Sequence, residues 1–204
     1  MYLNLILLAI LGASVAMLIR EGFWSNTITL FNTVTAGLIS TSTWELLATF
    51  LDEHMPDYTY FWDFISLWGI FIVSFVILRA ITDLLSRIRV RFKMPVELIG
   101  GGVMAGAVGW VLVCFATMTL HTAPLARNYL AGNFQPTPDA RMFFGLAPDQ
   151  KWLGLVQSLS NNSLSATGPG GSGVNTFDPE GDFILKYAER RSNLENNPAF
   201  SAGG

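Results

Sequence analysis

The sequence predicts an all-α membrane protein with four transmembrane helices and an extracytoplasmic, partly irregular C-terminal tail. Hydrophobic residues make up 51% of the 204-residue chain and charged residues only 13%, whereas an average soluble domain has about 25% charged residues. Four apolar segments are each long enough for a helix to cross a bilayer, which takes roughly 17–25 residues. Lysine and arginine are also distributed unevenly between the connecting loops, which is typical of membrane-spanning chains.

The four predicted spans differ in hydrophobicity. The first has only Asn4 and Ser14 as polar residues, the second is the most polar, and the last has no charged residue. A secretory signal peptide is the alternative for the first segment, but it would carry basic residues before its apolar core, and none precedes Leu3. The spans cover residues 3–19, 23–51, 61–81 and 98–120, and together they define a transmembrane domain over residues 1–120.

Basic residues predict the orientation of the chain. Arg20 follows the first span and a basic run follows the third, whereas residues 52–57 contain acidic residues and no lysine or arginine. Because cytoplasmic loops are enriched in lysine and arginine, we expect both basic turns in the cytoplasm and both termini outside it. The basic run is expected to anchor to anionic lipid, with docking of a cytosolic partner as the alternative; it comprises Arg87, Arg89, Arg91 and Lys93.

Small and polar residues form a stripe along the second span. They recur at alternating steps of three and four residues, which places them on one face of a helix. We interpret the stripe as a seam at which small side chains let helices approach closely. A polar path for a small solute is the alternative. The stripe comprises Asn26, Thr29, Thr33, Ala36, Ser40 and Thr43.

Four ionisable residues lie near the ends of the second and third spans. Glu45 and Asp63 are expected at the outer interface, where a carboxylate stays hydrated, and a proton or cation relay is the alternative. Arg79 and Asp83 are four residues apart, a spacing that predicts an ion pair along one helix.

The fourth span begins with Pro95 in its first turn and carries small residues every fourth position after Glu97. This spacing is typical of a face that packs closely against another transmembrane helix. The predicted packing residues are Glu97, Gly101, Ala105 and Gly109, with Gly102 and Gly106 as a second small pair.

Two of these local patterns occur together in one known family. They are Arg20-Glu-Gly-Phe23 between the first two spans and the series from Glu97 to Gly109. With them, residues 1–120 resemble the CvpA family of colicin V production proteins, although family members usually have arginine where this chain has Val108. The resemblance implies a bacterial inner (cytoplasmic) membrane protein with about four spans. It also implies a role in toxin biosynthesis and export or in envelope homeostasis, and no established chemical activity.

Residues 121–204 form the predicted tail. Two short helices are expected there, at Pro148–Leu159 and at Pro179–Leu194, the second with Asp178 as its N-cap. The run Thr167–Val174 is rich in glycine and predicts an irregular loop. The aromatic residues of the tail indicate that it packs on the membrane surface or against a partner.

The sequence predicts a protein that is not an enzyme, with no catalytic, cofactor-binding or metal-binding residues. His54 and His121 lack a metal-ligand spacing and are expected as polar interfacial residues, and Cys114 is expected as a small buried hydrophobe. The leading hypothesis is a structural or scaffolding protein. An accessory subunit of a larger membrane complex and a small-solute channel or transporter are the alternatives. Membrane lipids and other membrane-protein subunits are the expected partners, and the net charge of −3 argues against nucleic acid.

Overall fold

The structure, a computed structural model, describes most of the chain. The described residues are 2–86, 93–124, 134, 137, 139–161, 166–167, 174–175, 177–178 and 180–195, with the backbone alone at 166–167, 174–175 and 195. Three of the predicted lipid-anchoring residues lie outside this part, as do Pro179 and most of the glycine-rich run. The three are Arg87, Arg89 and Arg91.

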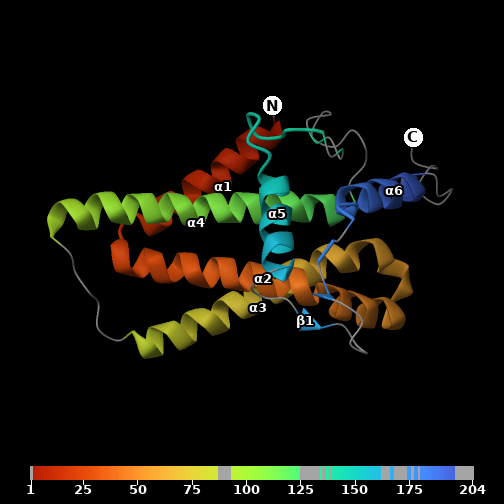
Figure 1. Ribbon diagram of the computed structural model, residues 1–204, viewed down its shortest axis with the longest axis horizontal. Coiled ribbons are helices and arrows are strands. Elements are labelled where there is room, and N and C mark those ends of the chain that lie inside the picture. The colour runs from red at the N-terminus through yellow and green to blue at the C-terminus, as the bar shows by residue number, and fades with distance from the viewer. Residues whose placement is uncertain are drawn as a thin grey trace.

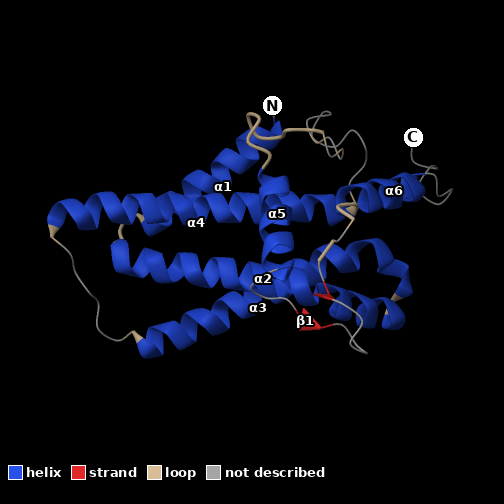
Figure 2. Cartoon of the chain, viewed as in Figure 1, coloured by secondary structure: helices blue, strands red, loops and turns tan. Residues whose placement is uncertain are grey.

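Nearly all of the described chain is helical (Figures 1 and 2). The long helices are α1 (Tyr2–Leu18), α2 (Phe23–His54), α3 (Thr59–Leu85) and α4 (Met94–Thr122), and a short 3-10 helix, η1 (Pro56–Tyr58), turns α2 into α3. The tail contains α5 (Pro148–Asn161), α6 (Phe183–Glu195) and two antiparallel strands, β1 (Ala166–Thr167) and β2 (Val174–Asn175). The predicted all-α class is confirmed, and the two-residue pairing is the one departure from it in the described part of the chain.

Helix α2 lies at the centre of the bundle. It packs against both α3 and α4, while α1 packs on α4. In Figure 1, α2, α3 and α4 run along the long axis and α1 crosses them obliquely. Two ends result. At the Arg79 end (residues 18–23, 79–86 and 94–101), α1 leads into α2, α3 ends and α4 begins. At the tail end, α2 leads into α3, and α4 leads into the tail.

Two stretches of the described chain are long and apolar enough to cross a membrane. They are Pro56–Leu85 and Met94–Thr122, and α1 is apolar but shorter. Helix α2 is not among them, because serine, threonine and asparagine interrupt its apolar residues. That all four long helices span a membrane stays a prediction.

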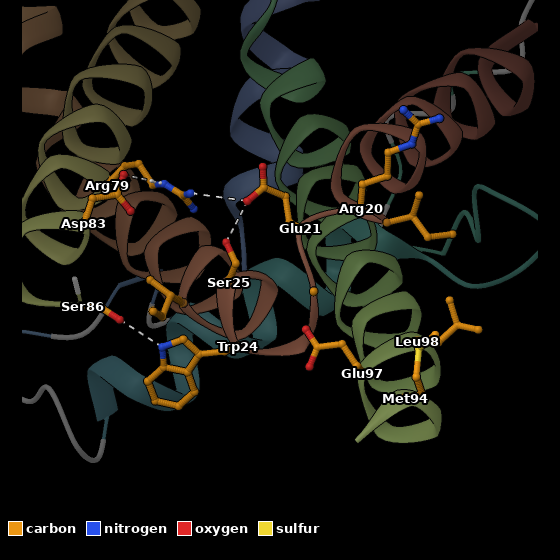
Figure 3. A pocket seen from close by; sticks show the side chains of 13 residues that line it. Arg20, Glu21, Trp24, Ser25, Arg79, Asp83, Ser86, Met94, Glu97 and Leu98 are labelled. Carbon is orange, nitrogen blue, oxygen red and sulfur yellow. Dashed lines mark hydrogen bonds and ion pairs between the residues drawn. The ribbon is translucent and has the colours of Figure 1, made fainter. Parts of the chain in front are cut away.

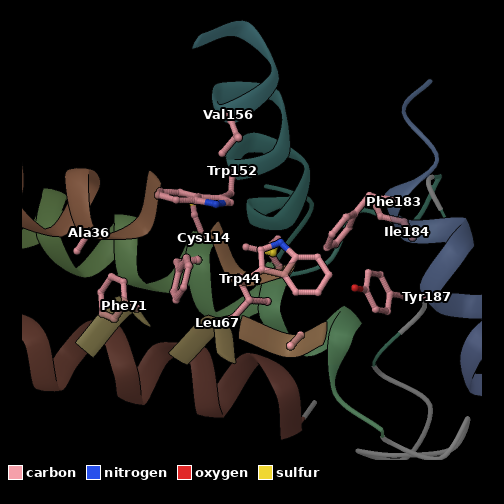
Figure 4. Close-up of a cluster of buried hydrophobic side chains, with 13 residues drawn as sticks. Ala36, Trp44, Leu67, Phe71, Cys114, Trp152, Val156, Phe183, Ile184 and Tyr187 are labelled. Carbon is pink, nitrogen blue, oxygen red and sulfur yellow. The ribbon is translucent and has the colours of Figure 1, made fainter. Parts of the chain in front are cut away.

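The tail helices complete the larger hydrophobic core. Trp152 and Val156 of α5 and Phe183 and Tyr187 of α6 converge on side chains of α2, α3 and α4 (Figure 4). Cys114 is buried in this cluster, as expected. The tail therefore packs on its own bundle.

Helix α6 begins four residues later than predicted. Asp178 and Gly181 have positive φ angles of 46° and 69°, so the chain turns before the helix starts. The Asp178 carboxylate still accepts hydrogen bonds from the backbone amides of Asp182 and Phe183. Asp178 thus satisfies the amides at the start of this helix, although it stands farther from the first helical residue than an ordinary N-cap.

Candidate functional site

The polar stripe of α2 faces its neighbouring helices. Asn26, Thr29, Thr33 and Ser40 are buried, and Thr43 is half-buried. The Ser40 hydroxyl donates to the Leu67 carbonyl of α3 at 2.6 Å. The Asn26 amide donates to the carbonyls of Leu18 and Gly101, both at 2.9 Å, and so joins α2 to the end of α1 and to α4. The threonine hydroxyls bond within their own helix: Thr29 to Ser25, Thr33 to Thr29 and Thr43 to Ile39.

Arg79 is the centre of a charged network at the Arg79 end (Figure 3). Its Nε donates to Asp83 at 3.1 Å, which is the predicted ion pair, and its Nη1 donates to the Thr29 hydroxyl at 2.7 Å. Its Nη2 lies 3.8 Å from the Glu21 carboxylate, which also accepts a hydrogen bond from Ser25 at 2.9 Å. At 3.8 Å the Glu21 contact is an ion pair without a direct hydrogen bond.

A polar cavity of about 450 Å³ opens beside this network. Its charged lining comes from α3, α4 and the turn between α1 and α2. Trp24 also lines it, and its indole nitrogen donates to the Ser86 hydroxyl at 3.0 Å (Figure 3). The ionisable lining residues are Arg20, Glu21, Arg79, Asp83 and Glu97.

A second cavity, an apolar groove of about 420 Å³, adjoins the polar one. The two cavities share Glu21 and Arg79 as lining residues. Residues of α1, α2, α3 and α4 line the groove, and most of those other than Arg79 and Glu21 are apolar. Its remaining lining residues are Ser14, Met17, Leu18, Thr29, Thr33, Phe71, Phe75, Val108 and Leu112.

The small residues of α4 divide between two faces. A Cβ added to Gly101 would lie 3.4 Å from the backbone of Gly22, and one added to Gly109 would lie 2.9 Å from the Leu11 side chain. Ala105, between them, is fully buried. Gly102 and Gly106 have open space instead. The two predicted small-residue series therefore lie on different faces, and within the described residues only the first packs against other elements.

Glu97 lies at the start of the first of these faces. Its carboxylate stands where a Cβ on Gly22 would be, and Gly22 has a positive φ of 85°. Only glycine fits such a position without strain. The two family-like patterns of the sequence, Arg20-Glu-Gly-Phe23 and the series from Glu97, therefore meet in space.

At the tail end, Asp63 ties α6 to α3. Its carboxylate accepts a hydrogen bond from the Tyr187 hydroxyl at 3.1 Å and forms an ion pair with Arg190, which also donates to the Thr59 carbonyl. Burial and the neighbouring Asp63 carboxylate raise the pKa of the Tyr187 phenol, so Tyr187 stays a hydrogen-bond donor. Asp63 is itself buried, so its interpretation as a hydrated interfacial carboxylate was wrong, whereas Glu45 is exposed.

A second polar contact at the tail end is completely buried. His121 Nε2 and Asp149 Oδ2 lie 3.0 Å apart, and neither side chain is exposed. The centroid of the Phe134 ring lies 4.9 Å from that of the His121 imidazole, and the Arg191 guanidinium lies over the Phe134 ring at 5.1 Å. The interpretation of His121 as an interfacial residue was therefore wrong, because α5 covers it. His54 is exposed and bonds the Phe50 carbonyl.

These sites offer packing and binding chemistry. Within the described residues, no group of three or more His, Cys, Asp and Glu side chains is placed to hold a metal ion. The tail-end contacts, at Asp63 and at His121, join segments 127 and 28 residues apart. No local pattern in the sequence indicates that these residues meet. For the pair of His121 and Asp149, the sequence offers only that Asp149 lies in the first turn of a predicted helix and that His121 follows an apolar segment.

The fold and these sites define a helical membrane protein whose buried polar groups join its helices to one another. The chain belongs to the Colicin V production protein family, whose family model matches residues 3–135. The resemblance identified from the two sequence patterns is thereby confirmed, and the match extends past residue 120 into the tail. No curated protein and no solved structure matches the chain.

Proposed function

We propose that this protein is a four-span structural protein of the bacterial inner membrane, a scaffold linked to export or envelope homeostasis, and that it is not an enzyme. One observation carries the structural role. The donors of the α2 stripe are used between and within helices, as in the bonds from Ser40 to Leu67 and from Asn26 to Gly101. A solute path would need such groups to face an open pore. The family to which the chain belongs agrees with this role.

The surface of α2 supports its assignment as a span. Its polar stripe is covered by α3 and α4, and the residues that it exposes include Phe31, Ile39 and Leu46. A membrane helix can carry polar side chains when they face other helices. Helix α1, with 17 residues, is about 26 Å long, close to the roughly 30 Å of a hydrocarbon core.

Tryptophan positions support the placement of the membrane between the two ends. Trp24 lies at the Arg79 end, and Trp44, Trp62 and Trp68 lie toward the tail end. Tryptophan is enriched at both membrane–water interfaces. The basic Arg79 end then faces the cytoplasm, and the tail lies outside with both termini.

Cysteine labelling tests this orientation. The native Cys114 is buried, so it gives little background. Lys93 immediately precedes α4 at the Arg79 end, Lys151 lies on α5, which follows the other end of α4 in the chain, and both side chains are exposed. In intact spheroplasts, a membrane-impermeant maleimide should label Lys151→Cys and should label Lys93→Cys only after lysis. Labelling of Lys93→Cys before lysis, with Lys151→Cys protected, would reverse the orientation.

Solute flux tests the structural role against a channel. We expect vesicles containing the protein to leak small solutes no faster than empty vesicles. Flux that disappears on Thr33→Leu and Ser40→Leu would contradict the structural role and favour a path along the stripe. Phe31→Leu, on the exposed face of α2, is the matched control.

An accessory subunit of a larger complex is the second candidate, and the open face of α4 favours it. In the described structure a Cβ added to Gly102 or Gly106 would meet no atom of a neighbouring element within 4 Å, and Val103 beside them is 59% exposed. Small residues on a membrane helix commonly mark where another helix packs. Extraction in mild detergent followed by size determination tests this: co-elution with other membrane proteins supports a subunit, and a single small monomer counts against one.

A further inference from the structure

The two adjoining cavities at the Arg79 end form one amphipathic site. Phe71, Phe75, Val108 and Leu112 line the groove, and the charged network of Arg79 and its carboxylate neighbours lines its mouth. From Arg79 to Phe71 is eight residues of α3, or about 12 Å along the helix axis. Each cavity lies within the range of about 300–1,000 Å³ that is typical of ligand pockets. An occupant that fills both must be charged at one end and apolar along the rest.

The charges at the mouth select among such molecules. Arg79 has donors beyond those that it gives to Asp83 and Thr29, and the Nη2 contact to Glu21 at 3.8 Å is long enough to yield to a better acceptor. A phosphate oxygen fits that position, because guanidinium groups bind phosphate well. The mouth also carries three carboxylates, Glu21, Asp83 and Glu97, while the Arg20 guanidinium points away from Arg79 and Glu21 (Figure 3). The carboxylates disfavour a purely anionic headgroup and favour one that adds an ammonium group.

We propose that this site binds phosphatidylethanolamine, a phospholipid whose headgroup carries both a phosphate and a primary ammonium. The phosphate is held by Arg79, the ammonium donates to Glu21 and Glu97, and an acyl chain lies in the groove between α1 and α3. The proposal rests on the membrane placement proposed above, which puts the mouth at the level of the cytoplasmic headgroups. A quaternary ammonium cannot donate hydrogen bonds to the carboxylates, so phosphatidylcholine binds less well.

Spin-labelled lipids test the headgroup preference. The full-length protein is reconstituted in phosphatidylcholine vesicles with trace spin-labelled phosphatidylethanolamine, phosphatidylcholine or phosphatidylglycerol, and electron paramagnetic resonance measures the motionally restricted fraction of each label. We expect association of phosphatidylethanolamine to exceed that of the other two by about three- to tenfold, as a charge-assisted hydrogen bond in a partly hydrated site gives. Equal association of all three, which is non-selective annular lipid only, would overturn the proposal, as would a preference for phosphatidylglycerol.

Variants of the site test whether it is the origin of the headgroup preference. Glu97→Gln and Arg79→Gln should each remove most of the preference for phosphatidylethanolamine, while Asp139→Asn, an exposed residue of the tail, should retain it.

A variant of the groove tests the position of the acyl chain. Leu112→Phe fills the groove and should reduce association of phosphatidylethanolamine without changing the charged groups at the mouth. Ile77→Phe adds the same ring on the exposed surface of α3 and should leave association unchanged. A preference that survives both charge variants and Leu112→Phe would place the lipid elsewhere and overturn the proposal.

Flotation of the vesicles separates this inference from the proposed function. Protein that does not float with the vesicles would overturn both, because the chain would then not reside in the membrane. Protein that floats, and that shows no headgroup preference, would overturn the lipid site alone. Variants that do not float are replaced in the comparison by Leu112→Phe, which alters no charged or hydrogen-bonding group of the mouth.

Discussion

The two ends of the bundle are held together by different means. At the Arg79 end, helices meet through backbone and small residues, as where Gly101 lies against Gly22, and the charged groups border an open cavity. At the tail end, large side chains such as Trp44 and Trp152 fill the core (Figure 4). The pair of His121 and Asp149 there is fully buried.

This difference indicates a division of roles. A buried charged or polar pair tolerates no loss of its partner, because the remaining group cannot be hydrated. A half-exposed network can exchange one partner for another at little free-energy change. The buried pair of His121 and Asp149 is therefore suited to hold a fixed shape, and the half-exposed network of Arg79 is suited to exchange one partner for another.

The largest effect should come from the buried pair. Asp149→Ala leaves His121 without its partner and opens a cavity, and it should lower the free energy of unfolding by about 3 kcal/mol, as an unpaired buried polar group beside a cavity does. At the Arg79 end, Asp83→Ala should cost less than about 1 kcal/mol, because the Asp83 side chain is 60% exposed. Chemical unfolding in detergent, followed by circular dichroism, measures both. Equal losses would remove the contrast between the ends.

The second largest loss of stability should come from the contact between Trp152 and Gly37 of α2. A Cβ on Gly37 would overlap the Trp152 ring, so Gly37→Ala should destabilise by about 1–3 kcal/mol, as overpacking a core does. Gly69→Ala is the matched control, because open space surrounds Gly69. If the overlap is the cause, Trp152→Phe should recover part of the loss in the double variant. Faster proteolysis of α5 in Gly37→Ala than in the wild type would show that the tail has loosened.

The two ends also differ in how far their contacts could be predicted from the sequence. The α2 stripe and the pair of Arg79 and Asp83 arise from spacings of three and four residues within one helix, where periodicity is a sufficient guide. The pair of His121 and Asp149 depends on where the tail folds back. Neither residue has a local neighbour that indicates its partner, and burial was set by α5, whose docking surface includes Gly37 and Phe115. The charged cavity likewise required three helix ends to meet.

A smaller effect is expected where α6 meets α3. Arg190→Gln removes the ion pair with Asp63 and should cost about 1–2 kcal/mol, because Asp63 is buried while Arg190 is about one-third exposed. The loss should shrink in high salt, since the exposed side of the pair is screened. Lys151→Gln, an exposed base on α5, is the control and should change little. A loss that is identical at low and high salt would contradict an electrostatic origin.

The smallest change in stability is expected on α4, where the same substitution should act differently on its open face and on its packed face. Gly106→Ala places its methyl in open space and should stabilise the isolated protein by about 0.5–1 kcal/mol, since alanine favours a helix over glycine. Gly109→Ala should lose this gain, because its Cβ would lie 3.2 Å from the Leu11 carbonyl oxygen. Thermal unfolding in detergent measures both. If another subunit packs on the open face, Gly106→Ala should also weaken co-purification of that subunit while the isolated protein becomes more stable. A gain in stability with unchanged co-purification would indicate that lipid, and not another subunit, contacts the open face of α4.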